Sequence, residues 1–264
     1  MGKTIVITSG KGGVGKTTAV ANIGSALASM DQKVVLVDAD IGLRNLDVVL
    51  GLENRIVYDI VDVVEGRAKL RQALIKDKRF PNLCLLPAAQ TRDKEAVSPE
   101  DMIRLCRDLR EEFDFIIIDS PAGIERGFKN AVAPADLAII VTTPEVSAVR
   151  DADRIVGLLE AMEKEESKLI VNRVRTKLVS RGDMLSVEDV LDILSIDLIG
   201  VIPEDEHIII STNRGEPLIN NNSAPAGRSF LDIARRILGE DVPINMYTED
   251  ENLFTRLKRL IGWR

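Results

Sequence analysis

The chain has 264 residues, of which 45% are hydrophobic, 29% are charged and only 3% are aromatic. This composition favours a globular protein with a core of Val, Ile, Leu and Ala, as in a parallel sheet covered on both faces. The net charge of −7 argues against a general nucleic-acid binder, whose surface is usually strongly basic. Two cysteines and one histidine exclude a disulfide framework and the zinc sites that need several such ligands.

Short apolar runs alternate with amphipathic stretches along most of the chain. The runs are rich in β-branched residues and predict buried strands at 4–8, 33–38, 83–86, 115–119, 137–142, 169–172 and 198–202. The longer stretches between or after them predict helices at 17–30, 99–112, 145–162, 187–194 and 226–238. This alternation predicts one α/β domain over residues 1–243, with a doubly wound, mostly parallel sheet flanked by helices. Its ligand site is expected at the carboxyl ends of the strands.

The first expected strand runs directly into a phosphate-loop motif of the form GxxxxGK[ST]. The backbone N–H groups of such a loop surround phosphate oxygens, and the following helix directs its positive end at the same anion. We expect Lys16 to neutralise charge between the β and γ phosphates and the Thr17 hydroxyl to bind Mg²⁺. The alternative is a glycine-rich turn that only joins the strand to the helix, and such a turn would not need every position of the GxxxxGK[ST] motif. The predicted nucleotide-binding residues here are Gly10, Lys11, Gly12, Gly13, Val14, Gly15, Lys16, Thr17 and Thr18.

Acidic residues end two further expected strands at the same edge of the sheet. Asp119 follows four apolar residues and is expected to hold the magnesium ion. Asp38 and Asp40 place carboxylate oxygens near the γ-phosphate, where an attacking water is oriented and loses a proton. The predicted switch residues, which respond to the nucleotide, are Asp38, Asp40, Asp119, Ser120, Pro121, Ala122 and Gly123.

Lys11 gives the loop the form KGGVGKTT, and with it the chain resembles the deviant Walker A ATPases. This group includes plasmid-partition ATPases, the nitrogenase iron protein and the division-site-determining MinD branch. Further motifs resemble the MinD branch in particular and extend over essentially the whole chain. They are DADIGLRNLD at 38–47, QALIKD at 72–77, LPAAQTRD at 86–93, DSPAGIE at 119–125, SRGDM at 180–184 and VIPED at 201–205.

The resemblance implies a role for several of these residues, with ATP and Mg²⁺ as cofactors. Lys11 corresponds to a lysine that reaches the phosphates of the partner subunit in an ATP-bound homodimer, although a solvated loop lysine is the alternative. Asp40 corresponds to the residue that positions the attacking water, so the predicted catalytic residues are Lys11, Lys16 and Asp40. Asp38 joins Thr17 and Asp119 in the predicted metal site. Adenine recognition, with a turn role as the alternative for Asn172, is expected at Asn172, Pro203, Glu204 and Asp205.

The C-terminal residues predict a second functional element. Residues 244–251 indicate a polar, acidic tether, and residues 252–264 an amphipathic helix with an apolar arc of about 120°. Its basic flanks and terminal tryptophan favour binding at a membrane surface, which the resemblance also implies; docking on the chain's own domain or on a partner is the alternative. One such helix alone is expected to bind lipid only marginally. Two helices on one dimer bind the membrane together, which can raise the apparent lipid affinity by roughly 10²–10⁴-fold. The predicted membrane residues are Leu253, Phe254, Leu257, Lys258, Leu260, Ile261 and Trp263.

The resemblance therefore implies an ATPase that dimerises with ATP, positions the cell or plastid division site, and leaves the membrane after hydrolysis. Its implied partners are an anionic membrane surface, a MinC-like division inhibitor and a MinE-like ATPase activator, with residues 145–153 as the expected docking surface. No nucleic-acid partner is expected. We expect a cytoplasmic protein, peripheral on the inner face of the cell membrane or of the plastid envelope, because residues 3–9 do not form a secretion signal.

Four other functions share part of the pattern. A ParA-type DNA-partition ATPase would need a basic surface on the dimer, and a MinD-like regulator of flagellar number would share nearly every motif. An iron–sulfur protein would need Cys84 and Cys106 placed to share a cluster across a dimer, but both lie in patterns typical of core residues. A nucleotide-gated binding module would lack turnover.

Overall fold

The computed structural model describes residues 2–92, 96–164, 166–221 and 224–247. The predicted membrane helix at 252–264 and the second half of the predicted tether, residues 248–251, lie outside these residues. Within them, no helix combines the length and the apolar character that crossing a bilayer requires.

The sheet of the described chain has eight strands in the order β3-β4-β2-β5-β1-β6-β7-β8. All neighbours are parallel except β3 and β4, so the predicted doubly wound, mostly parallel sheet is confirmed. The sequence did not predict β3 because two residues are too short to show a period of two. The strands are β1 Lys3–Thr8, β2 Val34–Asp38, β3 Ile75–Lys76, β4 Leu83–Leu86, β5 Phe115–Asp119, β6 Leu137–Thr142, β7 Ser167–Val174 and β8 Asp197–Pro203.

The five expected helices all form, with ends that differ from the predicted ones by a few residues at most. They are α1 Lys16–Ser29, α5 Pro99–Leu109, α7 Val146–Ala161, α9 Val187–Leu194 and α11 Pro225–Ile237. Ser98 and Ser186 begin α5 and α9 with capping boxes, which satisfy N–H groups of the first turn. The short helices were not expected, because one or two turns carry too little periodicity; they are α2 Leu46–Val49, α3 Ile60–Val64, α4 Leu70–Ala73, α6 Arg126–Val132, α8 Thr176–Val179 and α10 Glu206–Asn213. Two 3₁₀ turns lie at Glu53–Arg55 and Leu218–Asn220.

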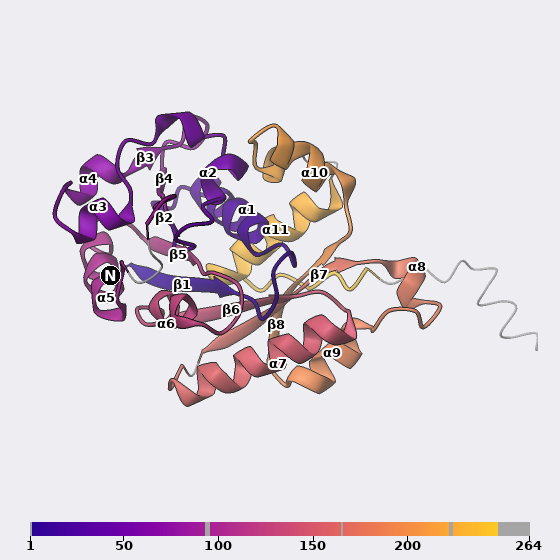
Figure 1. The fold of residues 1–264 in the computed structure, drawn as a ribbon. Coiled ribbons are helices and arrows are strands. Elements are labelled where there is room, and N and C mark those ends of the chain that lie inside the picture. Colours follow the sequence, from indigo (N-terminus) through magenta and orange to yellow (C-terminus); the bar gives the residue numbers. More distant parts are fainter. Residues whose placement is uncertain (1, 93–95, 165, 222–223, 248–264) are drawn as a thin grey trace, which may run out of the picture.

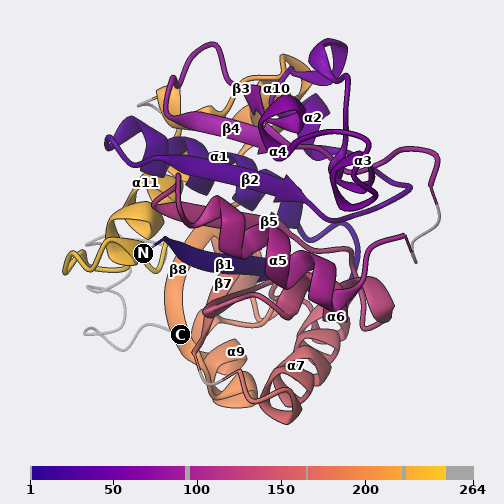
Figure 2. The same ribbon diagram turned by 90° about the vertical axis from the view of Figure 1, so that its left-hand side faces the viewer.

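Helices cover both faces of the sheet (Figures 1 and 2). Alternating residues of β1 show the division: Ile5 and Ile7 pack in the core beneath α1 and α11, whereas Val6 packs with α5, α6 and α7. Ile244 and Met246 are half-buried against the core that contains Val6, so the packed part of the chain extends beyond residue 243. Both faces of the sheet are therefore buried, and other groups can approach it at the amino and carboxyl ends of its strands.

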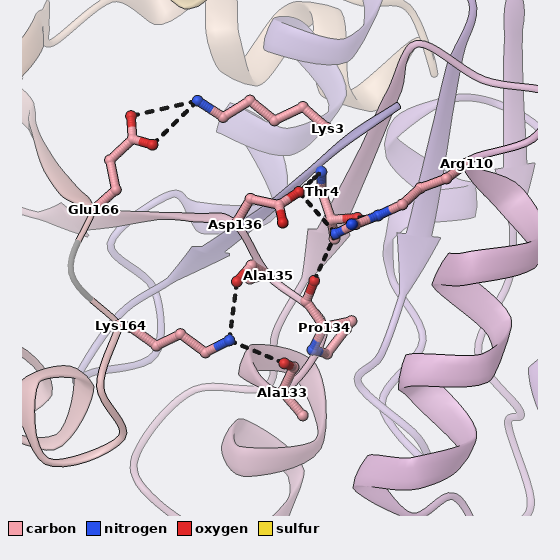
Figure 3. A network of polar contacts seen from close by, with 9 residues as sticks. All are labelled: Lys3, Thr4, Arg110, Ala133, Pro134, Ala135, Asp136, Lys164 and Glu166. Carbon is pink, nitrogen blue, oxygen red and sulfur yellow. Dashed lines mark hydrogen bonds and ion pairs between the residues drawn. The ribbon is translucent and has the colours of Figure 1, made fainter. Parts of the chain in front are cut away.

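The amino end of the sheet carries a network of paired polar groups (Figure 3). The Asp136 carboxylate accepts hydrogen bonds from the Thr4 backbone N–H and the Arg110 guanidinium, both at 2.7 Å. Arg110 also donates to the Thr4 hydroxyl and to the Pro134 carbonyl. Lys164 donates to two carbonyl oxygens at the end of α6. These charges tie the end of α6 to β1 and α5 on the side of the sheet opposite the phosphate loop.

Candidate nucleotide-binding site

The phosphate loop joins β1 to α1 and is held tightly at two glycines. Gly15 has φ 95°, a left-handed conformation that favours glycine, and a Cβ there would lie 2.3 Å from Asn172 Nδ2. A Cβ on Gly10 would lie 2.2 Å from the backbone oxygen of Asp151 in α7. Asn172 Nδ2 donates to the Val14 carbonyl at 2.7 Å. The loop is therefore fixed by β7 on one side and by α7 on the other.

Ser9 is a loop residue that sequence reasoning missed. Its hydroxyl donates to the Lys11 carbonyl at 2.9 Å, and its own carbonyl accepts the Gly123 N–H at 3.2 Å. The residue is 1% exposed. The sequence signal that could have identified Ser9 is its position between the strand and the first glycine of the loop. Through Ser9, the phosphate loop is joined directly to the predicted switch segment after β5.

Two buried aspartates lie side by side at the carboxyl end of the sheet. Asp38 and Asp119 are paired in register on β2 and β5, and they are 1% and 2% exposed. Burial, reinforced by the negative charge of Asp119, raises the pKa of Asp38 to about 7, although three backbone N–H groups donate to its carboxylate. Burial also raises the pKa of Asp119, against the opposing charge of Lys16. The fold thus places two buried carboxyl groups side by side, and the positive charge near them does not fully offset the effect of burial on their pKa values.

Lys16 and Thr17 open α1 beside these carboxylates. Lys16 Nζ lies 3.6 Å from Asp119 Oδ1, an oxygen that is buried and has no hydrogen-bond partner among the described residues. Carboxylate and hydroxyl oxygens are the ligands that Mg²⁺ prefers, and Mg²⁺ usually keeps waters and substrate phosphates as its other ligands. No cage of three or more His, Cys, Asp or Glu side chains occurs among the described residues. The oxygen atoms of Thr17, Asp38 and Asp119 therefore fit a Mg²⁺ ion shared with a bound nucleotide.

Lys11 is directed toward the start of α7. Its Nζ lies 3.8 Å from the Glu145 carboxylate and donates to the Ser147 hydroxyl at 3.3 Å. The side chains of Lys11 and Glu145 are 43% and 57% exposed, so the pair lies at the surface. Glu145, which precedes α7, and Ser147 within it belong to the stretch expected to bind partners, so that stretch contacts the phosphate loop.

The two predicted switch segments meet around a small apolar cavity of about 20 Å³, room for about one water molecule. Asp40, which is half-buried, and Pro121 both line it. Asn130 of α6 lines it as well, and its buried Oδ1 atom has no hydrogen-bond partner in the part of the chain that the structure describes. Sequence reasoning missed Asn130, because a polar residue in an unrecognised short helix gives no signal.

The residues expected to recognise adenine gather at the ends of β7 and β8. Pro203 pairs with Val174, and the Glu204 N–H donates to the Val174 carbonyl at 3.0 Å. The Asp205 carboxylate accepts backbone N–H groups that begin α10 and α11. Both polar groups of Asn172 are used within the protein, since its Oδ1 accepts the following backbone N–H. In this conformation Asn172 and Asp205 therefore hydrogen-bond to the protein's own backbone. Adenine recognition by these residues stays a prediction.

The two cysteines are core residues. Cys84 in β4 and Cys106 in α5 are 7% and 1% exposed, and burial raises the pKa of both thiols. Buried, protonated thiols do not favour the iron–sulfur alternative.

Comparison with known proteins agrees with this geometry. The family of the CobQ/CobB/MinD/ParA nucleotide binding domain matches residues 5–218. The septum site-determining protein MinD of Bacillus subtilis is 56% identical over 267 residues, covering 100% of both chains. The chain belongs to the MinD family of septum site-determining ATPases.

Solved structures of MinD relatives share the fold. MinD in a MinC:MinD cell division complex of Aquifex aeolicus is 54% identical, with a TM-score of 0.87 over 93% of this chain and 99% of that one. MinD of Pyrococcus horikoshii, solved with Mg-ADP, is 30% identical, with a TM-score of 0.81 over 92% of this chain and 100% of that one. The MinD-family chain described here is thus a division-site-positioning ATPase, and the partition and flagellar alternatives are not favoured.

Proposed function

We propose that this chain works as an ATP-dependent homodimer that binds the membrane through its C-terminal tail and carries a division inhibitor to it. The observation that carries the proposal is the position of Lys11, exposed at the edge of the phosphate loop and paired with Glu145 rather than with a buried group. A lysine in this place can be supplied to a second copy, where it would stabilise the charge that develops on the transferred phosphoryl group.

Exposed apolar side chains around the phosphate loop support a dimer face. Leu43 after β2, Ile124 after β5 and Val146 at the start of α7 are 61%, 49% and 63% exposed. All three belong to loops or helix starts at the carboxyl end of the sheet, where the nucleotide is expected. A second copy packed over this end would cover them and would enclose the phosphates between the two chains.

The proposed reaction is in-line attack of water on the γ-phosphate. Lys16 and the loop N–H groups hold the phosphates, and Asp40 orients the attacking water. Thr17, Asp38 and Asp119 would hold a Mg²⁺ ion, which would supply positive charge to neutralise the phosphates. Hydrolysis would weaken the dimer, so that each tail again binds lipid alone.

Two protein partners complete the proposal. The Aquifex aeolicus relative forms a complex with MinC, which supports a MinC-like inhibitor as a partner of this chain. We place docking on residues 145–153 because Glu145 and Ser147 contact Lys11, so a bound partner can alter the phosphate loop. A MinE-like activator acting here would raise ATP turnover by moving Lys11.

Sedimentation of the full chain with anionic liposomes tests the membrane part of the proposal. We expect binding with Mg-ATP and little binding with Mg-ADP or without nucleotide. Deleting residues 253–264 should abolish lipid binding and leave basal ATPase activity. Lipid binding that is equally strong without nucleotide would contradict the proposal.

Asp40→Ala tests the reaction. This variant should still bind Mg-ATP and should accumulate as a dimer, because the attacking water is no longer oriented. Size-exclusion chromatography with light scattering measures the dimer, and phosphate release measures turnover. Full turnover in Asp40→Ala would remove this residue from the mechanism.

A further inference from the structure

The last described residues, 240–247, run back along α11 and are called the strap here. Near its beginning the strap contacts Arg236, in the last turn of α11, and near its end Tyr247 contacts Pro225, the first residue of α11. Figure 1 shows the segment in yellow, leaving α11 beside β8. The strap therefore runs antiparallel to α11.

Two arginines hold the first part of the strap: Arg235 pairs with Glu240 at 2.8 Å, and Arg236 fastens the next residues to the edge of the sheet. Arg236 donates from Nε to the Val242 carbonyl at 2.8 Å and from Nη2 to the Pro243 carbonyl at 2.7 Å. Its Nη1 donates to the Ile199 carbonyl in the edge strand β8 at 2.8 Å. The planar fork of an arginine can bridge several carbonyls in this way, whereas the single ammonium group of lysine does not match the geometry.

Tyr247 fastens the other end. Its hydroxyl hydrogen-bonds the Ser229 hydroxyl at 2.8 Å and donates to the Pro225 carbonyl at 3.2 Å. The Tyr247 N–H donates to Asn245 Oδ1 at 3.0 Å, which forms a tight turn. With φ 49°, Tyr247 lies in the left-handed region that bulky residues rarely adopt, and surrounding contacts must hold it there.

Between these fastenings the strap is only partly packed. Ile244 and Met246 are half-buried against the core on the α7 face, whereas α11 packs on the opposite face, so the strap wraps around the edge at β8. A cavity of about 390 Å³ separates it from α11, with Ser229, Asp232 and Asn245 in its lining. The strap is therefore held mainly at its two ends.

We propose that Arg236 and Tyr247 are positioning residues that fix where the C-terminal tail leaves the domain; this inference rests on the membrane binding proposed above. With the strap fastened, only residues 248–251 separate Tyr247 from the predicted helix at 252, whereas loss of the Arg236 and Tyr247 contacts frees residues 241–251, nearly three times as many. The effective concentration of a tethered group falls roughly as the −3/2 power of linker length. A nearly threefold longer linker therefore lowers the effective concentration of the second tail by up to about fivefold.

The two binding states respond differently to this change. A single tail binds lipid with an affinity that does not depend on its linker, so the nucleotide-free chain should be unaffected. A dimer gains from its second tail only through effective concentration, so its apparent lipid affinity should fall. General destabilisation of the domain would not produce this difference.

The test uses full-length Arg236→Met, Tyr247→Phe and the double variant, with liposomes of phosphatidylcholine and phosphatidylglycerol. Titration with a non-hydrolysable ATP analogue and Mg²⁺ measures dimer affinity, and titration without nucleotide measures single-tail affinity. Amide hydrogen exchange over residues 240–247 reports strap release. Arg107→Met is the matched control, since Arg107 is an exposed helical arginine that pairs with the neighbouring Asp108 at 3.6 Å. A second variant inserts eight Gly and Ser residues after Tyr247, which lengthens the tether without removing a strap contact.

We expect about a threefold to fivefold loss of dimer affinity in the double and insertion variants, with single-tail affinity, basal phosphate release and the control unchanged. Unchanged dimer affinity in the insertion variant, or in a double variant whose strap exchanges faster, overturns the positioning role. Equal losses in both binding states overturn it too. If the unaltered chain fails to bind liposomes with any nucleotide, the proposed membrane function itself fails, and the positioning role with it.

Discussion

The two ends of the parallel sheet hold their charges in opposite arrangements. At the amino end, the Asp136 carboxylate meets the Arg110 guanidinium and a backbone N–H, each at 2.7 Å (Figure 3). At the carboxyl end, Asp38 and Asp119 lie on adjacent strands, more than 97% buried, with Lys16 the nearby cation at 3.6 Å from Asp119. One end pairs each charge with a partner, and the other gathers like charges.

The difference separates stability from function. Paired charges at the amino end fix the ends of β1, α5 and α6 and require nothing from outside the chain. Burial, reinforced by repulsion from Asp119, raises the pKa of Asp38 to about 7. Such a site is unfavourable in the empty protein, and the divalent cation proposed to bind there would offset this cost and so would link folding free energy to ligand binding.

The largest effect is expected from removing the cation at the carboxyl end. Lys16→Ala should weaken Mg-ATP binding by about 1000-fold or more, because the phosphates lose a charge-assisted contact while Asp119 loses its neutralising neighbour. Isothermal titration with a non-hydrolysable analogue measures this. Lys168→Ala, at a lysine paired with Asp197 near the start of β7 and β8, is the control and should bind normally. Retained micromolar binding in Lys16→Ala would contradict the assignment.

The next effect concerns pH and the buried aspartates. Between pH about 4 and 7 the folded protein keeps the Asp38 proton that the unfolded chain has released, so stability falls as pH rises, by up to about 1.4 kcal/mol per pH unit. Asp38→Asn should remove this slope and stabilise the nucleotide-free protein at pH 8 by roughly 2 kcal/mol. Urea unfolding at pH 5 to 8 measures both effects. An equal slope in the variant would show that Asp38 is not its source.

The amino end should respond in the opposite sense. Asp136→Ala should destabilise the protein by about 1–2 kcal/mol, because Arg110 and the Thr4 N–H lose their common acceptor. Nucleotide affinity should not change, since the network lies at the other end of the sheet. Urea unfolding and nucleotide titration on the same sample check the two statements. A loss of affinity as large as that of Lys16→Ala would mean that the two ends are not separate.

The smallest effect is expected at the exposed Lys11–Glu145 pair. Glu145→Gln removes the carboxylate 3.8 Å from Lys11 Nζ and frees the lysine for a second subunit, which should tighten ATP-dependent dimerisation by a few-fold. Analytical ultracentrifugation with a non-hydrolysable analogue measures the change. Glu166→Gln, at another exposed lysine partner, is the control. Weaker dimerisation would indicate that Glu145 itself contacts the partner.

The sequence predicted the long elements and the phosphate loop more completely than the small ones. Strands such as β5 are apolar at nearly every position, and a complete loop motif followed β1, so both gave strong local signals. The helix α6 and the strand β3 did not, because seven and two residues hold too little periodicity. Asn130 and Ser9 were missed for a related reason, since their importance depends on neighbours distant in sequence.

What the sequence determined by itself is the chemistry available at one edge of an α/β sheet: carboxylates that end two strands, and a lysine and a hydroxyl that follow the loop after a third. The tertiary structure decided which of these groups share an environment. Registry between β2 and β5 places Asp38 beside Asp119, the packing of α7 directs Lys11 to Glu145, and Arg236 holds the strap against β8. Short-range patterns report local conformation, whereas burial, pKa and pairing depend on contacts between residues far apart in the chain, which exist only once the chain has folded.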